Sequence, residues 1–240
     1  MSESTVQEAM APYGLIAAPL AVAGEKRVLL HGVSWSTYKA LLKDLGNSRS
    51  SRLTFDSGEL EIMSPLDIHE DAQFGIGQLV TILVDEFGLE CRALGSLTCE
   101  RQDLDKAIEP DGCFYIQHFK DVKGVKTIEL GVHPPPDLMI EIDITTDSLN
   151  KLPICAALGV LEHWRYNAKS LEIRILKNGS YFESAESLAF PGMLFAKRMP
   201  EFLHMHVDGL MSMQRSFRAW IRDELRKRKT SKGLRRPKRV

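Results

Sequence analysis

The sequence predicts an α/β (α+β) fold in which one central mixed sheet is flanked by helices. Three stretches predict it. Leu53–Ile62 alternates apolar and polar residues around an Asp-Ser-Gly turn, which is typical of a β-hairpin. Ser64–Gly88 carries an apolar stripe with the period of a helix. Asp137–Ile144 is a short apolar run between prolines and Thr-Thr-Asp-Ser, which indicates a buried strand.

Composition places the chain among ordinary globular proteins. Its 240 residues are 44% hydrophobic and 26% charged, which fits one medium-sized domain with tails. No run of about 18 apolar residues occurs, so no membrane span is predicted. The acidic start of the chain lacks the basic region of a secretory signal, so we expect a cytoplasmic protein. Four cysteines without metal-ligand spacing are expected to be reduced core thiols: Cys91, Cys99, Cys113 and Cys155.

Charge is distributed unevenly along the chain. The formal net charge is −1, but Arg215–Val240 holds 12 Lys or Arg against two acids. That stretch therefore carries +10 and the rest of the chain −11. A basic tail on an acidic body favours an anionic partner, with nucleic acid first. The alternative is a solvated tail that only improves solubility.

In the N-terminal half, the first 30 residues show no period and predict a loosely ordered lead-in. Val33–Lys43 predicts a short helix, with Ser34 or Ser36 as its N-cap. The hairpin and the long helix follow, and Gly88 ends that helix. Two strands are then predicted, Cys91–Glu100 and Gly112–Ile116. The segment Gln117–His133, which precedes the central strand, is expected to be a surface loop.

Beyond the central strand, Ser148–Leu158 predicts a helix that Gly159 ends. Pro153 lies near its first turn, where a proline is least disruptive. Met193–Arg228 predicts a long helix. Three further strands are expected between these helices: Leu161–Tyr166, Ser170–Leu176 and Tyr181–Glu183.

Two carboxylates lie on the predicted central strand. Side chains alternate across a strand, so Glu141 and Asp143 are expected on the same face. Like charges on a buried face are unfavourable unless they are neutralised, and a divalent cation such as Mg²⁺ or Mn²⁺ suits carboxylate oxygens. The alternative is a strand end whose acids reach solvent or pair with Arg or Lys.

The order of several motifs resembles a known family. LEIMSP leads into a helix that carries His-Glu; EPDGCFYI, PPDLMIEIDIT and LNKLPICAALGVLEHWRY follow. This succession, over roughly Val33 to Met193, resembles the Uma-two type of restriction endonuclease, a branch of the PD-(D/E)XK nuclease superfamily. The resemblance implies a restriction-endonuclease-like core and a metal-dependent endonuclease that hydrolyses nucleic-acid phosphodiester bonds, with DNA as the expected partner.

The resemblance also implies roles for particular residues. Asp111 follows Pro110 and matches the Asp of the first half-motif, and Glu141 matches the acid of the second. Lys151 matches a lysine on the following helix, and Glu70 matches an acid of the early helix. These four are the expected catalytic residues, with Mg²⁺ or Mn²⁺ as cofactor.

Asp143 stands where the second half-motif usually has its lysine. We include Asp143 with Asp111 and Glu141 as a predicted metal ligand. His69 is a secondary candidate for the site. Three acids with a displaced lysine can still bind a metal. The alternative is an inactive nuclease-like module that binds nucleic acid or protein. The sequence leaves the oligomeric state open; a homodimer is one option, since many nucleases of this superfamily pair to cut both strands.

These expectations divide the chain into four parts. Residues 1–30 form the lead-in and residues 31–195 the nuclease-like domain. Residues 196–229 form a helical extension, and residues 230–240 a basic tail that is expected to be disordered because it is rich in charge, Gly and Pro.

Overall fold

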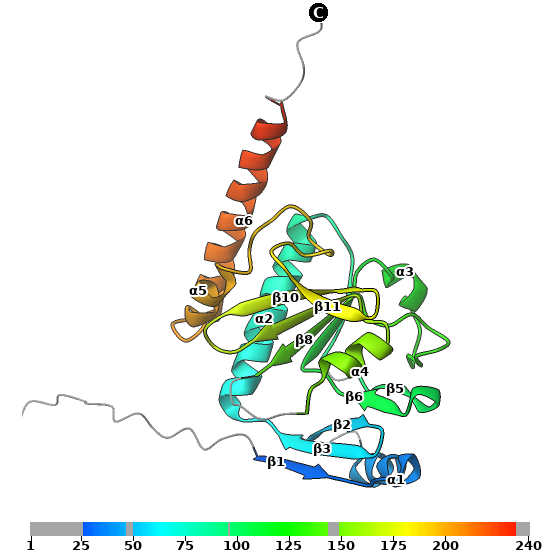
Figure 1. Cartoon of the computed structure of the whole chain (residues 1–240). Coiled ribbons are helices and arrows are strands. Elements are labelled where there is room, and N and C mark those ends of the chain that lie inside the picture. The colour runs from blue at the N-terminus through cyan, green and yellow to red at the C-terminus, as the bar shows by residue number, and fades with distance from the viewer. Residues whose placement is uncertain (1–25, 47–49, 96, 144–148, 234–240) are drawn as a thin grey trace, which may run out of the picture.

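The protein contains two sheets that lie next to each other (Figure 1). The structure is a computed structural model, and it describes residues 26–46, 50–95, 97–143 and 149–233. The first sheet is antiparallel, and the second is mixed. The predicted α/β architecture with a mixed sheet flanked by helices is confirmed, but the second sheet was not expected.

The strand order defines each sheet. The first sheet has the order β1 (Lys26–Leu30), β3 (Glu59–Ser64), β2 (Arg52–Asp56), β6 (Lys106–Ile108) and β5 (Cys99–Arg101). The second has the order β11 (Ser180–Ser184), β10 (Leu171–Lys177), β9 (Glu162–Tyr166), β8 (Leu138–Ile142), β7 (Gly112–Tyr115) and β4 (Arg92–Leu94). The β8–β9 pair is parallel and its neighbours are antiparallel. The predicted hairpin is β2–β3, and the predicted central strand is β8.

A helical crossover links the two parallel strands. Parallel neighbours need such a connection, and α4 (Leu152–Ala157) supplies it between β8 and β9. Pro153 lies in the first turn of α4, where a backbone N–H group would have no acceptor within the helix, so the N–H that proline lacks costs no hydrogen bond. Gly159 follows at φ +82°, a conformation that glycine adopts without strain. The helix expected over 148–158 is thus present from Leu152, and residue 148 lies outside the described part.

Three helices cover one face of the mixed sheet. They are α2 (Asp67–Glu86), α5 (Met199–His204) and α6 (Leu210–Gly233). Their apolar side chains join Trp164, Tyr166 and the other inward residues of β7–β10 in one core. The single helix predicted over 193–228 is therefore wrong, because residues 205–209 turn between α5 and α6. In Figure 1, α6 lies beside α2 and projects beyond the body.

On the opposite face, α4 and the first sheet enclose a smaller core that includes Cys99, Met139 and Cys155. The four cysteines are free thiols, as the sequence predicts. The helix α1 (Trp35–Leu45) packs Tyr38 on Phe55 of the first sheet, and Ser34 caps it by accepting a hydrogen bond from the Thr37 amide. Short helical turns occur at Gln102–Leu104 and at α3 (Phe119–Val122).

Three segments differ from expectation at the level of single elements. Residues 26–30, expected in the lead-in, form β1, because all five pair with β3. Lys106–Ile108, which has no strand signal of its own, forms β6 between β2 and β5. The last helix continues to Gly233, four residues into the expected tail, whose remainder lies outside the described residues. None of the described helices combines the length and the hydropathy that a membrane crossing needs.

Candidate active site

The chain passes from one sheet to the other at residues 109–111, between β6 and β7. Glu109 anchors this step, since its carboxylate accepts hydrogen bonds from the Leu53 amide at 2.9 Å and the Thr98 hydroxyl at 2.7 Å. Pro110 follows, and Asp111 precedes the first residue of β7. The predicted candidate Asp111 therefore lies at the junction of the two sheets, with its side chain 1% exposed.

Asp111 lies directly opposite Glu141 on the neighbouring strand. The antiparallel register pairs Gly112 with Ile140, so the next pair outward is Asp111 with Glu141. Residues in such a pair share a face of the sheet, with Cβ atoms about 5 Å apart. The Asp111 Oδ2 atom also accepts a hydrogen bond of 2.6 Å from the Ile142 amide. The fold thus brings together two acids that are 30 residues apart in the sequence.

Lys151 reaches the same place from the start of α4. Its Nζ lies 2.5 Å from Glu141 Oε2, and the two side chains are 12% and 5% exposed. The fold therefore positions the predicted lysine beside the predicted acid. Cys155, one turn further along the helix, lies beneath this pair; burial first, and the Glu141 carboxylate second, raise the pKa of its thiol well above its usual value. Cys155 is thus a neutral core thiol at ordinary pH.

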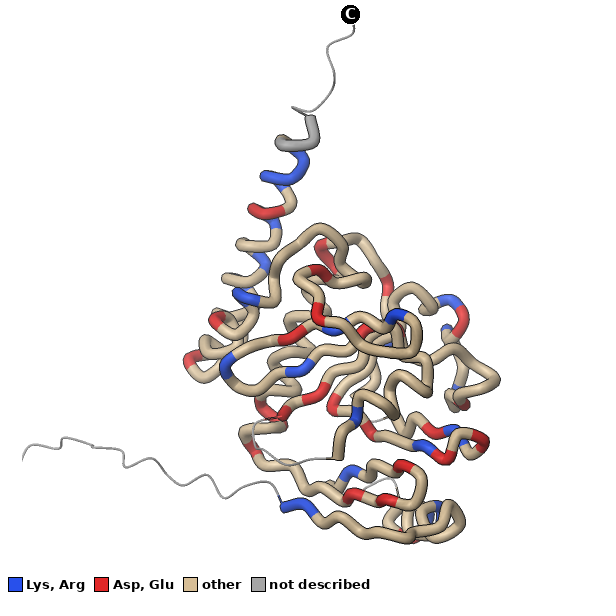
Figure 2. Tube along the Cα trace, viewed as in Figure 1, with Lys and Arg blue, Asp and Glu red and all other residues tan. Residues whose placement is uncertain are grey.

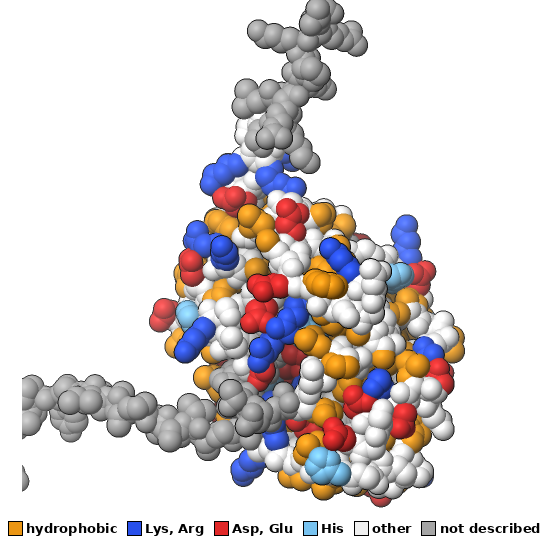
Figure 3. All heavy atoms as spheres, in the orientation of Figure 1, with side chains coloured by type: hydrophobic (Ala, Val, Ile, Leu, Met, Phe, Trp, Pro, Cys, Tyr) orange, Lys and Arg blue, Asp and Glu red, His pale blue; other side chains and the backbone are white. Residues whose placement is uncertain are grey.

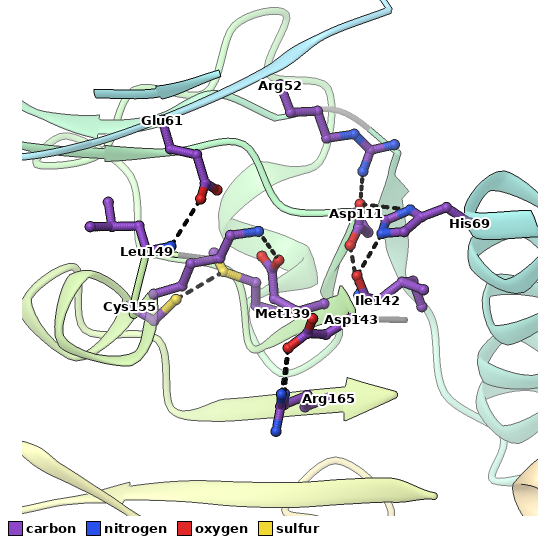
Figure 4. A network of polar contacts seen from close by, with 12 residues as sticks. Arg52, Glu61, His69, Asp111, Met139, Ile142, Asp143, Leu149, Cys155 and Arg165 are labelled. Atoms are coloured by element: carbon purple, nitrogen blue, oxygen red, sulfur yellow. Dashed lines mark hydrogen bonds and ion pairs between the residues drawn. The ribbon is translucent and has the colours of Figure 1, made fainter. Parts of the chain in front are cut away.

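Arg52, the first residue of β2, is a member of the site that the sequence analysis did not identify. Its guanidinium forms an ion pair with Asp111 through Nη1 (Figure 4). Through Nη2 it contacts Glu70 at 3.1 Å and Gln73 at 2.7 Å. Its partners are 18 to 59 residues away along the chain, and no local motif marks it.

The first turns of α2 supply two more of the predicted candidates. Glu70 is 53% exposed and reaches the site through Arg52. His69 is fully buried, with Nε2 2.5 Å from the Ile142 carbonyl oxygen and Nδ1 3.6 Å from Asp111 Oδ1 (Figure 4). In the tautomer with hydrogen on Nε2, the ring donates to that carbonyl. His69 thus fixes the end of β8 against α2.

Asp143 lies one residue beyond the end of β8 and pairs with Arg165 of β9. Arg165 Nε is 3.0 Å from Asp143 Oδ2, and this contact raises the pKa of the guanidinium. Figure 4 shows Asp143 directed toward Arg165. Asp137, at the other end of the strand, accepts hydrogen bonds from the Ile116 and His118 amides, as befits a residue at a strand entry.

A cleft of about 1500 Å³ opens beside Arg52 and Glu70. Arg52, Glu70, Glu109 and Pro110 form part of its wall, and residues 126–131 form another part. A smaller pocket of about 180 Å³ is lined by Asp111, Gln73 and Ile140, among others. Asp111, whose side chain is buried, therefore borders the smaller pocket, and its partner Arg52 borders the cleft.

A family model described as "Uma2: Putative restriction endonuclease" matches residues 35–193. The chain belongs to the Uma2 family. The resemblance drawn from the sequence is thus confirmed, and the site described above falls inside the matched Uma2 region. No curated protein is significantly similar to this chain.

Among solved structures, the chain is similar to a crystal structure of "a putative nuclease belonging to DUF820" from Anabaena variabilis ATCC 29413. The two share 18% sequence identity, and the match covers 72% of this chain and 96% of that one, with a TM-score of 0.44.

The donor set suits a divalent cation, but it is not arranged around one. Among the described residues, no three His, Cys, Asp or Glu side chains are grouped as metal ligands. Two buried carboxylate oxygens nevertheless have no hydrogen-bond partner within the described part of the chain: Glu141 Oε1 and Asp143 Oδ1. Buried acceptors are normally satisfied, so these two oxygens are exceptions that call for an explanation. They are hard donors of the kind that Mg²⁺ and Mn²⁺ prefer.

Proposed function

We propose that this Uma2 protein is a metal-dependent endonuclease that hydrolyses phosphodiester bonds in nucleic acid, with DNA as its substrate. The observation that supports this most strongly is the cross-strand pair of Asp111 and Glu141, with Lys151 beside it, at the junction of the two sheets. Membership of a family described as restriction endonucleases supports the same chemistry.

Asp111, Glu141 and Asp143 would hold Mg²⁺ or Mn²⁺. Glu141 and Asp143 each offer a buried oxygen without a hydrogen-bond partner among the described residues. When bound, the cation supplies Lewis-acid charge at a phosphoryl oxygen. The proposal gives Asp111 the third ligand position because it lies opposite Glu141 in the register of β7 and β8.

The remaining candidates act around this centre. The Lys151 ammonium, held 2.5 Å from Glu141, stabilises charge that develops on the phosphate. Glu70 lines the cleft and orients the groups that meet there. His69 is a positioning residue, because its contacts are with the Ile142 carbonyl and with Asp111.

The test is nicking of supercoiled plasmid in Mg²⁺ or Mn²⁺ by the wild-type protein and by Glu141→Ala. We expect the variant to lose at least about a hundredfold in rate, since an electrostatic group of the site is removed. Glu172→Ala is the matched control, because Glu172 also pairs with a basic residue, Arg174, but on β10 away from the cleft. Equal nicking by wild type and Glu141→Ala, or none with either metal, contradicts the proposal.

A non-catalytic binding module is the second candidate, and a specific observation favours it. Each of the three proposed acidic ligands already has a basic partner: Arg52 for Asp111, Lys151 for Glu141 and Arg165 for Asp143. Calorimetry separates the two candidates. Mn²⁺ binding that Glu141→Ala abolishes supports the nuclease, whereas salt-sensitive DNA binding without Mn²⁺ binding supports the module.

The basic helix is the proposed contact with the nucleic-acid backbone. Figure 2 shows Lys and Arg recurring along α6, and Figure 3 shows them on the exposed surface of its outer part. Arg226 and Lys227 are 75% and 63% exposed. Such cations displace counterions from DNA and bind it without sequence preference. A homodimer, with one site for each strand, completes the proposal and is measured by analytical ultracentrifugation.

A further inference from the structure

Arg52 places one positive charge between two of the proposed catalytic acids. Its Nη1 atom pairs with Asp111, and its Nη2 atom donates to Glu70 at 3.1 Å and to Gln73 at 2.7 Å. The side chain is 14% exposed and lies on the wall of the cleft. A guanidinium is therefore fixed at the point where the acids converge and where the cleft opens.

Asp111 has little capacity left for another cation in this arrangement. Its Oδ2 accepts from the Ile142 amide at 2.6 Å, and its Oδ1 is engaged by Arg52. By contrast, Glu141 Oε1 and Asp143 Oδ1 have no hydrogen-bond partner in the described part of the chain. The site thus has two open acidic oxygens and a third acid that a basic side chain occupies.

We propose, resting on the proposed function, that Arg52 exchanges partners during the reaction cycle. In the metal-free protein it neutralises Asp111. When a divalent cation binds, Arg52 leaves Asp111 but stays anchored by Glu70 and Gln73, and its freed Nη1 binds a phosphate of the nucleic acid in the cleft. Arg52 is thereby a substrate-binding residue of the nuclease.

Charge balance supports this exchange. Asp111 is buried, so loss of Arg52 without a replacement would leave an uncompensated charge, which is strongly unfavourable. The cation replaces Arg52 at Asp111, and the phosphate replaces Asp111 at Arg52. A planar guanidinium suits phosphate oxygens as well as carboxylate oxygens, because its N–H groups form the same fork with both. Metal and substrate therefore favour each other's binding.

The first measurement is the affinity of the full-length, metal-free protein for Mn²⁺ by calorimetry. Arg52→Gln removes the competing charge, so we expect it to bind Mn²⁺ about tenfold more tightly than wild type. Arg52→Lys keeps the charge but not the fork, and an intermediate affinity is expected. Arg218→Gln is the matched control, since Arg218 also bridges two carboxylates, Asp85 and Glu86, outside the cleft.

The second measurement is the KM of each variant for a short duplex at saturating Mn²⁺. Arg52→Gln is expected to raise KM about tenfold, the usual effect of losing a hydrogen bond to a charged group. Opposite effects on metal and DNA are the signature of the exchange. A residue with a merely structural role would weaken both, and that result overturns the inference.

Three outcomes distinguish this inference from the proposed function. Mn²⁺ binding that depends on Glu141 but is equal in wild type and Arg52→Gln overturns the role of Arg52 alone. If neither wild type nor Arg52→Gln binds Mn²⁺, both the role of Arg52 and the nuclease proposal fail. If Arg52→Gln is unstable, Arg52→Lys decides, and a Mn²⁺ affinity no higher than that of wild type overturns the exchange.

Discussion

At the scale of single residues, the site is defined by pairs of opposite charges that are largely buried. Asp111 and Glu141 are 1% and 5% exposed, and each forms an ion pair with a basic side chain, Arg52 and Lys151 respectively. The desolvation of such pairs offsets most of their attraction, so an apolar pair of similar volume would stabilise the fold as well or better. Stability therefore does not explain why acids stand at these two positions, whereas the proposed metal chemistry would.

His163 gives a residue-scale prediction about pH. It lies on β9 against Tyr181, and both of its ring nitrogens lack a hydrogen-bond partner among the described residues. Burial, reinforced by nearby Arg174, Lys151 and Arg165, lowers the pKa of its imidazole to about 3. The folded protein therefore keeps His163 neutral at pH values where the unfolded chain, with a pKa near 6.5, already binds a proton.

The sign of this linkage is set by which state binds the proton. Below about pH 6.5 the unfolded chain gains the proton first, so the contribution of His163 to stability is complete above that pH and is lost as pH falls toward 3. The loss approaches about 1.4 kcal/mol for each pH unit. His163→Phe should remove this component. Urea denaturation of both proteins between pH 7 and pH 4 measures it, and parallel pH profiles would contradict the prediction.

At the scale of elements, α6 is held to the body by an apolar face and a polar edge. Phe217 is fully buried against Phe202 in the main core. Its neighbour Arg218 pairs with Asp85 and Glu86 at the end of α2, and Arg222 also pairs with Glu86. The Arg222 contact, first among several, lowers the pKa of Glu86. The apolar contacts and the ion pairs are expected to contribute different amounts to the free energy of unfolding.

We predict that the apolar face dominates. Phe217→Ala should lower the free energy of unfolding by about 3 to 5 kcal/mol, because it removes a buried ring and leaves a cavity. Arg218→Ala should lower it by no more than about 1 kcal/mol, because its ion pairs are partly exposed and screened. Denaturant midpoints of the two variants, compared with wild type, measure the difference. Similar losses in both would show that the ion pairs, rather than the ring, attach α6.

The elements also show what local sequence could predict and what it could not. The stripe of α2 and the alternation of β2–β3 are local patterns, and both were predicted correctly. β6 has only three residues and exists because β2 and β5 pair with its two sides. Across the break between α5 and α6, Phe202 packs against Phe217, a contact between two helices that a continuous helical pattern does not reveal. The strand β6 and this contact both belong to the tertiary arrangement.

The candidate site follows the same division. Asp111, Glu141 and Lys151 stand in a recognisable succession of motifs, and the fold brings them together. Their catalytic roles remain predictions. Arg52 has no motif, and its link to Asp111 spans 59 residues, so only the three-dimensional arrangement could identify it. The pairing of Asp143 with Arg165 was one of the alternatives that the sequence left open.

At the scale of the whole molecule, two charged regions are spatially separate. The paired acids lie where the two sheets meet, whereas the Lys and Arg residues of α6 lie along a helix that packs beside α2 and extends beyond the body of the protein (Figure 2). DNA bound in the cleft would have to run along the surface of the protein to contact α6 as well. Such a contact adds affinity at a distance from the chemistry, so it should change binding without changing the chemical step.

The last prediction concerns the five Lys and Arg residues of the C-terminal stretch: Lys232, Arg235, Arg236, Lys238 and Arg239. Each cation that contacts a phosphate adds about 0.9 to the slope of log affinity against log salt. Replacing all five with Gln should therefore weaken duplex binding at low salt and flatten the slope by up to about 4.5. Fluorescence anisotropy over 50–300 mM salt measures it. An unchanged slope with lower solubility would mean that these residues only keep the protein in solution.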